Sequence, residues 1–476
     1  MNQGTLSKAK SKSQYVIVAE DGEYFLPAHQ LPEELGRLVV QNGAISVGFE
    51  HEGKKVLNVW LAVSREPSPA LEPSSKSGTA MSFRNPYNFV PVVKRSDIKP
   101  PLGDDEPAGH HILKRQLFTG CLLVSLEVVS PLLLVDPSRG RKDRSGHQFL
   151  PALKDAKNKP LLPATSIKGV IRSSFEAVTN SRLGVVEDRA RFDESLLPAA
   201  DPKRLSPAER VFGWANPNGK GAYRGQVRIH PGVVRGSLQV KDHPRDGVAL
   251  AVLSGPKPHP PFYQDGGRAR GRKAYPHQRL VGEGELALPA GEWQIRRRTN
   301  QNRSIQHWVR PTTVFEFQLR FMNLSRVELG ALIWLLDRVG ELGGYLRIGG
   351  GKPLGFGSTR SRIQWDSAKS RIRTGEDYRR KYESLSGEHA GETSDHRQSA
   401  ETAFKEEIRK QYGHGRGFEE VSFIAAFLKS TQGYGDQLPT KYPSKRNWFD
   451  RLEYKSVPLQ ELSVDRGLPP ELDAEA

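Results

Sequence analysis

The chain has 476 residues, of which 36% are hydrophobic and 26% are charged, and its formal net charge is +17. No run approaches the ~18 apolar residues of a membrane span, the N-terminus lacks the apolar segment of a signal peptide, and the single cysteine, Cys121, excludes an intrachain disulfide or a cysteine-based zinc cluster. We expect a cytoplasmic protein with no membrane contact that binds a polyanion, most commonly nucleic acid.

The N-terminal part predicts a small β-domain followed by a linker. Residues 1–13 are polar and are expected to form a disordered tail. Strand-like runs between residues 14 and 64 indicate a small β-barrel of the OB or cold-shock type. Residues 65–116 are expected to hold a Pro/Ser-rich linker and an aromatic strap, residues 81–92. We expect the strap to pack on the protein's own core, and the alternative is that it lies across a partner subunit.

Residues 117–194 are expected to begin the main domain. The run from Cys121 to Val129 is mostly apolar, which is typical of a strand buried on both faces. A basic loop follows it and carries two acids, Asp136 and Asp143. Asp136 stands before a proline, so it is either a functional carboxylate or a turn-forming residue.

The segment around residues 160–176 predicts a helix with an anion-binding N-terminus. Thr165 or Ser166 is the expected cap, and the helix should run to about Thr179. Lys168 and Arg172 are four residues apart and therefore share one face of the helix. The free N–H groups and the two cations suit an anion. The alternative is an amphipathic helix whose basic residues are solvated.

Residues 195–310 form a basic insertion. From residue 268 to residue 310 there are ten Lys/Arg against three acids, and Tyr275, Trp293 and Trp308 lie among them. Cations interleaved with aromatic rings suit single-stranded nucleic acid, because charges follow phosphates and rings stack on bases. The alternative is a solvated insertion with a few packed aromatics.

Residues 311–366 are expected to complete the main domain around a glycine-rich loop. An alternating strand, residues 314–321, and a helix, residues 324–342, precede the loop at residues 343–357, and a charged C-terminal extension, 367–476, follows. Arg347 and Lys352 flank Gly349, Gly350 and Gly351. Bare amides beside cations suit a phosphate, but Pro353 excludes a P-loop and Leu354 excludes the dinucleotide fingerprint. A tight glycine-rich hairpin is the alternative.

The expected elements follow the order β-α-β…β-α-β: a strand, a helix, further strands, a helix, the glycine loop and a strand. This is the α+β arrangement called ferredoxin-like or RRM-like. With the motifs LPATSIKGVIR at residues 162–172 and LRIGGGKPLGFG at residues 346–357, the chain resembles the RAMP superfamily of CRISPR-associated RNA-binding proteins. It looks most like the backbone (seventh Cas family) subunits of type III effector complexes. The strap NPYNFVP at residues 85–91 suggests the long, insertion-bearing type III-D kind.

The resemblance implies a ferredoxin-like core with large insertions that binds guide RNA and contacts target RNA. Its expected partners are other RAMP subunits and the large polymerase-like subunit. It assigns RNA binding to the helix and the glycine loop, that is, to Thr165, Ser166, Lys168, Gly169, Arg172, Arg347, Gly349, Gly350, Gly351, Lys352 and Phe356.

In family members that cut target RNA, an aspartate in the loop after the first strand acts with a divalent metal. The resemblance therefore makes Asp136 and Asp143 candidate catalytic residues, with Asp136 as the ligand of Mg²⁺. Some backbone subunits do not cut. Two other readings stay open: a metal-independent endoribonuclease that matures guide precursor with a histidine, from His110, His111, His147 and His230, or a general RNA-binding protein.

Overall fold

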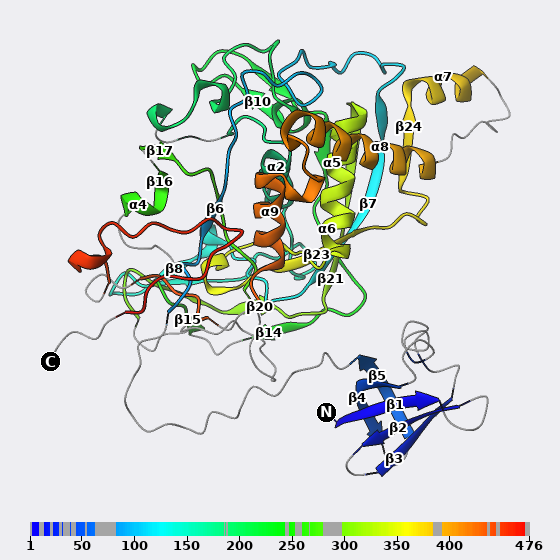
Figure 1. Ribbon diagram of the computed structural model, residues 1–476, viewed down its shortest axis with the longest axis vertical. Helices are drawn as coiled ribbons and strands as arrows, with labels where there is room; N and C mark the ends of the chain where they lie inside the picture. The colour runs from blue at the N-terminus through cyan, green and yellow to red at the C-terminus, as the bar shows by residue number, and fades with distance from the viewer. Residues whose placement is uncertain are drawn as a thin grey trace. The chain divides into compact units, whose positions relative to one another are not determined.

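The computed structural model of the protein (Figure 1) describes residues 2–8, 14–19, 22–27, 31, 39, 44–52, 55–61, 82–184, 186, 189–242, 247–252, 259–265, 267–278, 298–383, 393–435, 438–443 and 448–471. The chain forms two compact units, Met1–Thr79 and Ala80–Ala476. Each unit buries a hydrophobic core of its own. None of the helices in the described ranges is long and apolar enough to cross a membrane.

The first unit is a closed β-barrel with the strand order β1-β2-β3-β5-β4. Its strands are β1 (Asn2–Lys8), β2 (Gln14–Ala19), β3 (Gly22–Pro27), β4 (Ala44–Glu52) and β5 (Lys55–Leu61). β3 and β5 pair in parallel, whereas the other neighbours pair antiparallel. A small barrel is therefore present, as the sequence predicts, and its assignment to the OB type stays a prediction.

β1 corrects the prediction of a disordered tail for residues 2–8, whereas residues 9–13 of that predicted tail lie outside the described residues. Its residues pair with both β2 and β4, and Leu6 is fully buried inside the barrel beside Ile17 and Val47. Residues 2–8 are polar in composition, but they pair with two neighbouring strands and bury Leu6 in the barrel core. Composition alone does not reveal those partners.

The second unit is built on an antiparallel sheet, seven-stranded over the residues that the structure describes, in the order β12-β21-β7-β23-β22, with β13 pairing to β21 and β24 to β7. The strands are β7 (Phe118–Val128), β12 (Val227–Ile229), β13 (Val233–Arg235), β21 (Val314–Leu324), β22 (Leu346–Arg347), β23 (Ser358–Ile363) and β24 (Arg371–Thr374). The predicted mixed α/β class with an antiparallel sheet is observed.

The helices of the second unit are α2 (Ala164–Val178), α3 (Pro207–Phe212), α4 (Pro260–Tyr263), α5 (Arg326–Ile333), α6 (Val339–Glu341), α7 (Gly375–Glu383), α8 (Thr393–Ile408) and α9 (Ser422–Gln432). α2 packs against α5 and α9, and Figure 1 shows the three helices beside β7. Apolar side chains of these helices and of β7 and β21 form one core. The helices therefore cover one face of the sheet.

The predicted helix at residues 324–342 is present as α5, a π-helical turn (Trp334–Arg338) and α6. Ser325 caps α5 and Glu328 completes a capping box. The predicted cap of α2 is wrong: the helix begins at Ala164, and Pro163 is its N-cap with no side-chain hydrogen bond. With Pro163 as N-cap the helix begins two residues earlier than it would with Thr165 as N-cap.

The face of β7 away from the helices is half-buried, so the prediction that β7 is buried on both faces holds only in part. Leu122, Val124 and Leu126 point into the core, whereas Ser125 and Glu127 are partly exposed on the outward side. Of the apolar residues at outward positions, Leu123 is buried and Cys121 is half-buried.

The described parts of the region predicted as a basic insertion, and of its surroundings, contain short strands. They are β6 (Asn88–Val90), β8 (Arg141–Lys142), β9 (Gln148–Leu150), β10 (Gly213–Ala215), β11 (Ala222–Arg224), β14 (Val240–Asp242), β15 (Val248–Ala249), β16 (Gln264–Asp265), β17 (Arg268–Ala269), β18 (Arg272–Ala274), β19 (Arg303–Ile305) and β20 (His307–Val309). Trp308 is 1% exposed and packs on Phe356. Trp293 lies outside the described residues.

The aromatic strap packs on the second unit, as predicted. Phe83 is fully buried, and its backbone pairs with that of Leu468 near the C-terminus. Arg84 forms an ion pair with Asp465 at 3.3 Å. The β6 part of the strap pairs with β18. The strap thus holds the C-terminal segment and β18 together.

Candidate nucleic-acid interface

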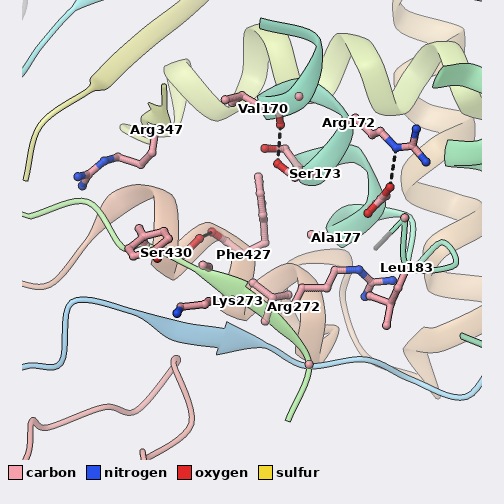
Figure 2. Close-up of a pocket in the computed structure, with 18 of the residues that line it drawn as sticks. Val170, Arg172, Ser173, Ala177, Leu183, Arg272, Lys273, Arg347, Phe427 and Ser430 are labelled. Carbon is pink, nitrogen blue, oxygen red and sulfur yellow. Dashed lines mark hydrogen bonds and ion pairs between the residues drawn. The ribbon is translucent and has the colours of Figure 1, made fainter. Parts of the chain in front are cut away.

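A cavity of about 740 Å³ lies between α2, β18, β22 and α9. Figure 2 shows Val170, Arg172 and Ser173 of α2 on one side and Phe427 and Ser430 of α9 on the other. The cations that line it are Arg172, Arg272, Lys273, Arg347 and Lys352. The cavity therefore joins the two predicted anion-binding segments, the α2 helix and the glycine-rich loop.

The glycine-rich loop needs its glycines for backbone geometry. Gly349, Gly351, Gly355 and Gly357 all have positive φ, between 69° and 88°. A Cβ on Gly357 would lie 1.9 Å from the Ile348 carbonyl oxygen. The loop is therefore a tight turn, as the alternative reading proposes. The same turn also sets Arg347 and Lys352 at the cavity.

Arg347 is the most deeply buried cation of the loop, at 8% exposure. Its guanidinium donates to the carbonyl oxygens of Pro276 at 2.8 Å, Lys352 at 2.6 Å and Phe356 at 2.9 Å, while its Nε has no partner. Among the described residues no carboxylate pairs with it. Burial lowers the pKa of Arg347 to about 9. Because only neutral carbonyl oxygens accept from the guanidinium, a bound anion would stabilise its charge.

Lys352 adds a second uncompensated charge. Within the described part of the chain its ammonium has no hydrogen-bond or ion-pair partner. Burial and the neighbouring Arg347 charge lower the pKa of Lys352. A bound phosphate would reverse both effects, since it would supply acceptors and opposite charge.

Arg272 and Lys273 of β18 complete the wall and were not singled out from the sequence. Arg272 is 9% exposed, donates to the Ser181 carbonyl oxygen and to Asn180 Oδ1, and leaves its Nε without a partner. Burial lowers the pKa of Arg272 to about 10, although Glu176 acts against this. Lys273 lies 3.8 Å from the centroid of the Tyr87 ring. In the sequence both residues belong to a basic run, and that run does not show which of its cations line a cavity.

The predicted residues of α2 divide into two sets. Gly169 and Arg172 line the cavity, but Arg172 is paired with Glu176 at 2.8 Å and also donates to the Gly213 carbonyl oxygen at 3.2 Å. Thr165, Ser166 and Lys168 do not line it. Burial and the Arg172 charge lower the pKa of Lys168, which is half-buried.

In the loop, Gly349, Gly350 and Gly351 shape the turn without lining the cavity. Phe356 is fully buried against Trp308 and is not available for stacking on a base. The structure thus brings together Gly169, Arg172, Arg347 and Lys352, and it leaves the other predicted RNA contacts outside the cavity.

Asp136 and Asp143 lie in the exposed loop after β7 and not at the cavity. Asp136 Oδ1 accepts from the Ser138 N–H at 3.0 Å and from its hydroxyl at 2.5 Å. Asp143 Oδ1 accepts from the Ser145 N–H at 2.9 Å and from the His147 N–H at 3.0 Å. These bonds, the serine hydroxyls first, lower the pKa of both carboxyls. Both are therefore ionised turn residues.

The donor set allows only limited metal ligation. In the described residues no three or more His, Cys, Asp or Glu side chains form a group that could hold a metal ion. A single exposed carboxylate such as that of Asp136 fits an ion that keeps most of its waters, as Mg²⁺ does. The residues present therefore fit a weakly held Mg²⁺ but no caged metal.

The histidines of the alternative endonuclease reading do not line the cavity. His147 is fully buried, with Nδ1 2.8 Å from the Thr299 carbonyl oxygen and Nε2 2.8 Å from Ser304 Oγ. His110 and His111 are exposed, and His230 is half-buried. Another histidine, His277, lies 4.3 Å from the ring of Tyr345; burial, with Arg347, lowers its pKa to about 3, so it is neutral.

The fold and the cavity define a mixed α/β protein whose antiparallel sheet supports a cationic pocket. Residues 125–360 match the family model described as the RAMP superfamily. The matched segment holds all of β21, α2 and α5, the glycine-rich loop, the first half of β23 and the last four residues of β7. The chain belongs to the RAMP superfamily through this segment.

No curated protein matches the chain. Among solved structures, a chain of a "Type IV-B CRISPR Complex" has 16% identity and a TM-score of 0.25, covering 52% of this chain and 91% of its own. The "Crystal structure of Thermofilum pendens Csc2" has 12% identity and a TM-score of 0.26, covering 67% and 87%. At such TM-scores neither similarity supports an argument about this protein.

Proposed function

We propose that this protein is a subunit of a CRISPR RNA-guided effector complex of the type III kind and that it binds the guide RNA backbone in the cationic cavity. The observation that carries the proposal is the buried charge of Arg347 beside the half-buried charge of Lys352. Neither has a carboxylate partner among the described residues, and the glycine-rich turn of a RAMP domain holds both at one cavity. Phosphates would supply the missing counter-charge.

The finer points of the fold belong to the same proposal. The order β12-β21-β7-β23 has the second, third, first and fourth strands of a β-α-β-β-α-β unit side by side, which we interpret as a ferredoxin-like core. We interpret the five-stranded barrel as OB-type, a fold with a natural oligonucleotide face. Target RNA, other RAMP subunits and the polymerase-like subunit are the proposed partners, and the type III-D kind is the proposed subtype.

Cleavage of target RNA is a further part of the proposal. Mg²⁺ would supply charge stabilisation of the leaving oxygen when bound. Asp136 would hold it, because its carboxylate is exposed, ionised and fixed by Ser138. Asp143 is the second candidate for the same role.

Purification of the protein from its host, followed by sequencing of the bound RNA, tests the assignment. Guide RNAs of uniform length with a common repeat-derived end are expected. Mixed cellular RNA would instead support a general RNA-binding protein. Site-specific cutting of repeat RNA in EDTA would support the maturation endonuclease, and either result would contradict the proposal.

Lys352→Gln tests the cavity. Loss of one phosphate contact should weaken binding of RNA-free protein to guide RNA about fivefold near 0.1 M salt and reduce the slope of log K against log[salt] by about 0.7. Anisotropy titrations at several salt concentrations measure both. Lys203→Gln removes the same charge from an exposed lysine outside the cavity and should leave both unchanged. If the two variants behave alike, the cavity is not the RNA site.

A further inference from the structure

The face of the sheet away from the helices carries a row of exposed arginines at one register. Arg228 of β12 lies opposite Arg320 of β21, Arg320 lies opposite Cys121 of β7, and Cys121 lies opposite Arg371 of β24. Directly opposed residues of neighbouring strands point to the same face. Since Leu319 and Phe321 on either side of Arg320 are buried, this row points away from the helices and from the cavity.

The arginine row, Arg228, Arg320 and Arg371, presents three charges to solvent. All three residues are exposed. Among the described residues none of the three forms an ion pair. The acids on this face are engaged elsewhere: Glu316 pairs with Arg235 at 2.5 Å and Glu127 with Arg360 at 3.4 Å.

The surroundings of Cys121 indicate that these positive charges lie close together. Burial raises the pKa of the Cys121 thiol, while Arg320, Arg371 and Lys369 act in the opposite direction. Cations from β21 and from the β24 side therefore face the same sulfur. Such a concentration of like charge is stabilised by a polyanion.

The chemistry of the face favours phosphates over bases and over a protein partner. The outward residues of β7 and β21 near the row are Thr119, Cys121, Leu123, Glu316, Gln318 and Met322, and none of them is aromatic. A stacking platform for bases needs rings, and protein interfaces usually rely on aromatic anchors. Guanidinium groups match phosphate oxygens in geometry and charge. Strand spacing of about 4.8 Å gives the row a span of roughly 14 Å.

We propose that the outward face of the sheet binds the sugar–phosphate backbone of a nucleic-acid strand through Arg228, Arg320 and Arg371, at a surface separate from the cavity. One arginine neutralises one phosphate, so the row accounts for three contacts. Recognition is independent of sequence, because phosphates carry no base information. The surface and the cavity lie on opposite faces of the sheet. Loss of RNA binding at one of them is therefore expected to leave the other intact.

The single cysteine of the chain makes the first test possible without a substitution. Cys121 lies inside the row, so a bound strand should slow its modification by a thiol-reactive probe several-fold. The rate is measured with and without saturating mixed-sequence single-stranded RNA. The same protection is expected in Lys352→Gln at RNA concentrations that saturate it. An unchanged rate in both proteins overturns the proposal.

The second test removes the row. Arg228→Gln, Arg320→Gln and Arg371→Gln together should weaken RNA binding on the order of a hundredfold near 0.1 M salt and reduce the salt slope by about 2, from three contacts of ~0.7 each. The control combines Arg204→Gln, Arg409→Gln and Arg416→Gln, exposed arginines outside the sheet with the same total charge. It should bind nearly as the parent does.

Four outcomes contradict the inference. Equal losses in the row variant and the control would indicate a general charge effect. Loss of affinity for an abasic strand in the parent protein would indicate base contacts. Unchanged RNA binding with loss of a co-purifying subunit would assign the face to an acidic protein. A defect in Lys352→Gln alone would support the cavity and not this surface.

Discussion

At the scale of single residues, the cations of the two motifs differ in whether a carboxylate balances their charge. The sequence alone does not show this difference. Arg172 has a carboxylate partner in Glu176, whereas Arg347 and Lys352 have none among the described residues. An uncompensated buried charge is costly, so proteins keep it where a ligand balances it. The glycine-rich loop is therefore a stronger candidate for phosphate binding than the face of α2.

Asp136→Asn tests the proposed cleavage. The amide oxygen still accepts from Ser138, so the turn should survive, but the negative charge that would hold Mg²⁺ is lost. We expect normal assembly and loss of one target-RNA product, measured on the purified complex with Mg²⁺. Ser138→Ala keeps the carboxylate and should still cut. Unaltered cleavage in Asp136→Asn would transfer the role to Asp143 or to another subunit.

At the scale of elements, the glycine-rich loop and α2 contrast in how they use glycine. Gly357 has φ +84° and no room for a Cβ, whereas Gly169 lies within α2 with no neighbouring atom within 4 Å of the place that a Cβ would take. The first glycine is required by the turn. The second is a helix residue that costs stability relative to alanine.

Gly357→Ala and Gly169→Ala should therefore shift stability in opposite directions. Gly357→Ala is expected to lower the free energy of unfolding by ~1–3 kcal/mol, because the backbone conformation is strained for alanine and the Ile348 carbonyl oxygen blocks the methyl group. Gly169→Ala is expected to stabilise by up to ~1 kcal/mol. Urea unfolding of both variants measures the difference. Equal midpoints would mean that the turn relaxes freely.

At the scale of the whole molecule, the two units have separate cores. Among the residues whose burial is described, the barrel core contains seven, whereas the second unit has one large core and several smaller ones. Small domains bury a lower fraction of their surface and are only marginally stable. The barrel is therefore expected to unfold first.

Deletion of residues 1–79 tests this independence. Residues 80–476 alone should fold, keep the main thermal transition within about 2 °C and lack an earlier, smaller transition seen in the full chain. Calorimetry of both proteins measures the transitions. An insoluble or destabilised fragment would show that the second unit needs the first.

The sequence determined the features that depend on neighbouring residues. Helical periodicity, the alternation of β21, the glycine positions and the excess of cations were all readable, and they predict the RAMP resemblance that the family match confirms. They also place Arg347 and Lys352 together, because a short turn separates them.

Which charges are paired and which side chains are exposed follows from contacts between distant segments. Strand register alone brings together four residues that are far apart in the chain: Arg228, Arg320, Cys121 and Arg371. Arg272 reaches the cavity because β6 of the strap pairs with β18. Burial, ion pairing and the direction of a strand face depend on contacts between distant segments, and local sequence patterns carry no record of those contacts.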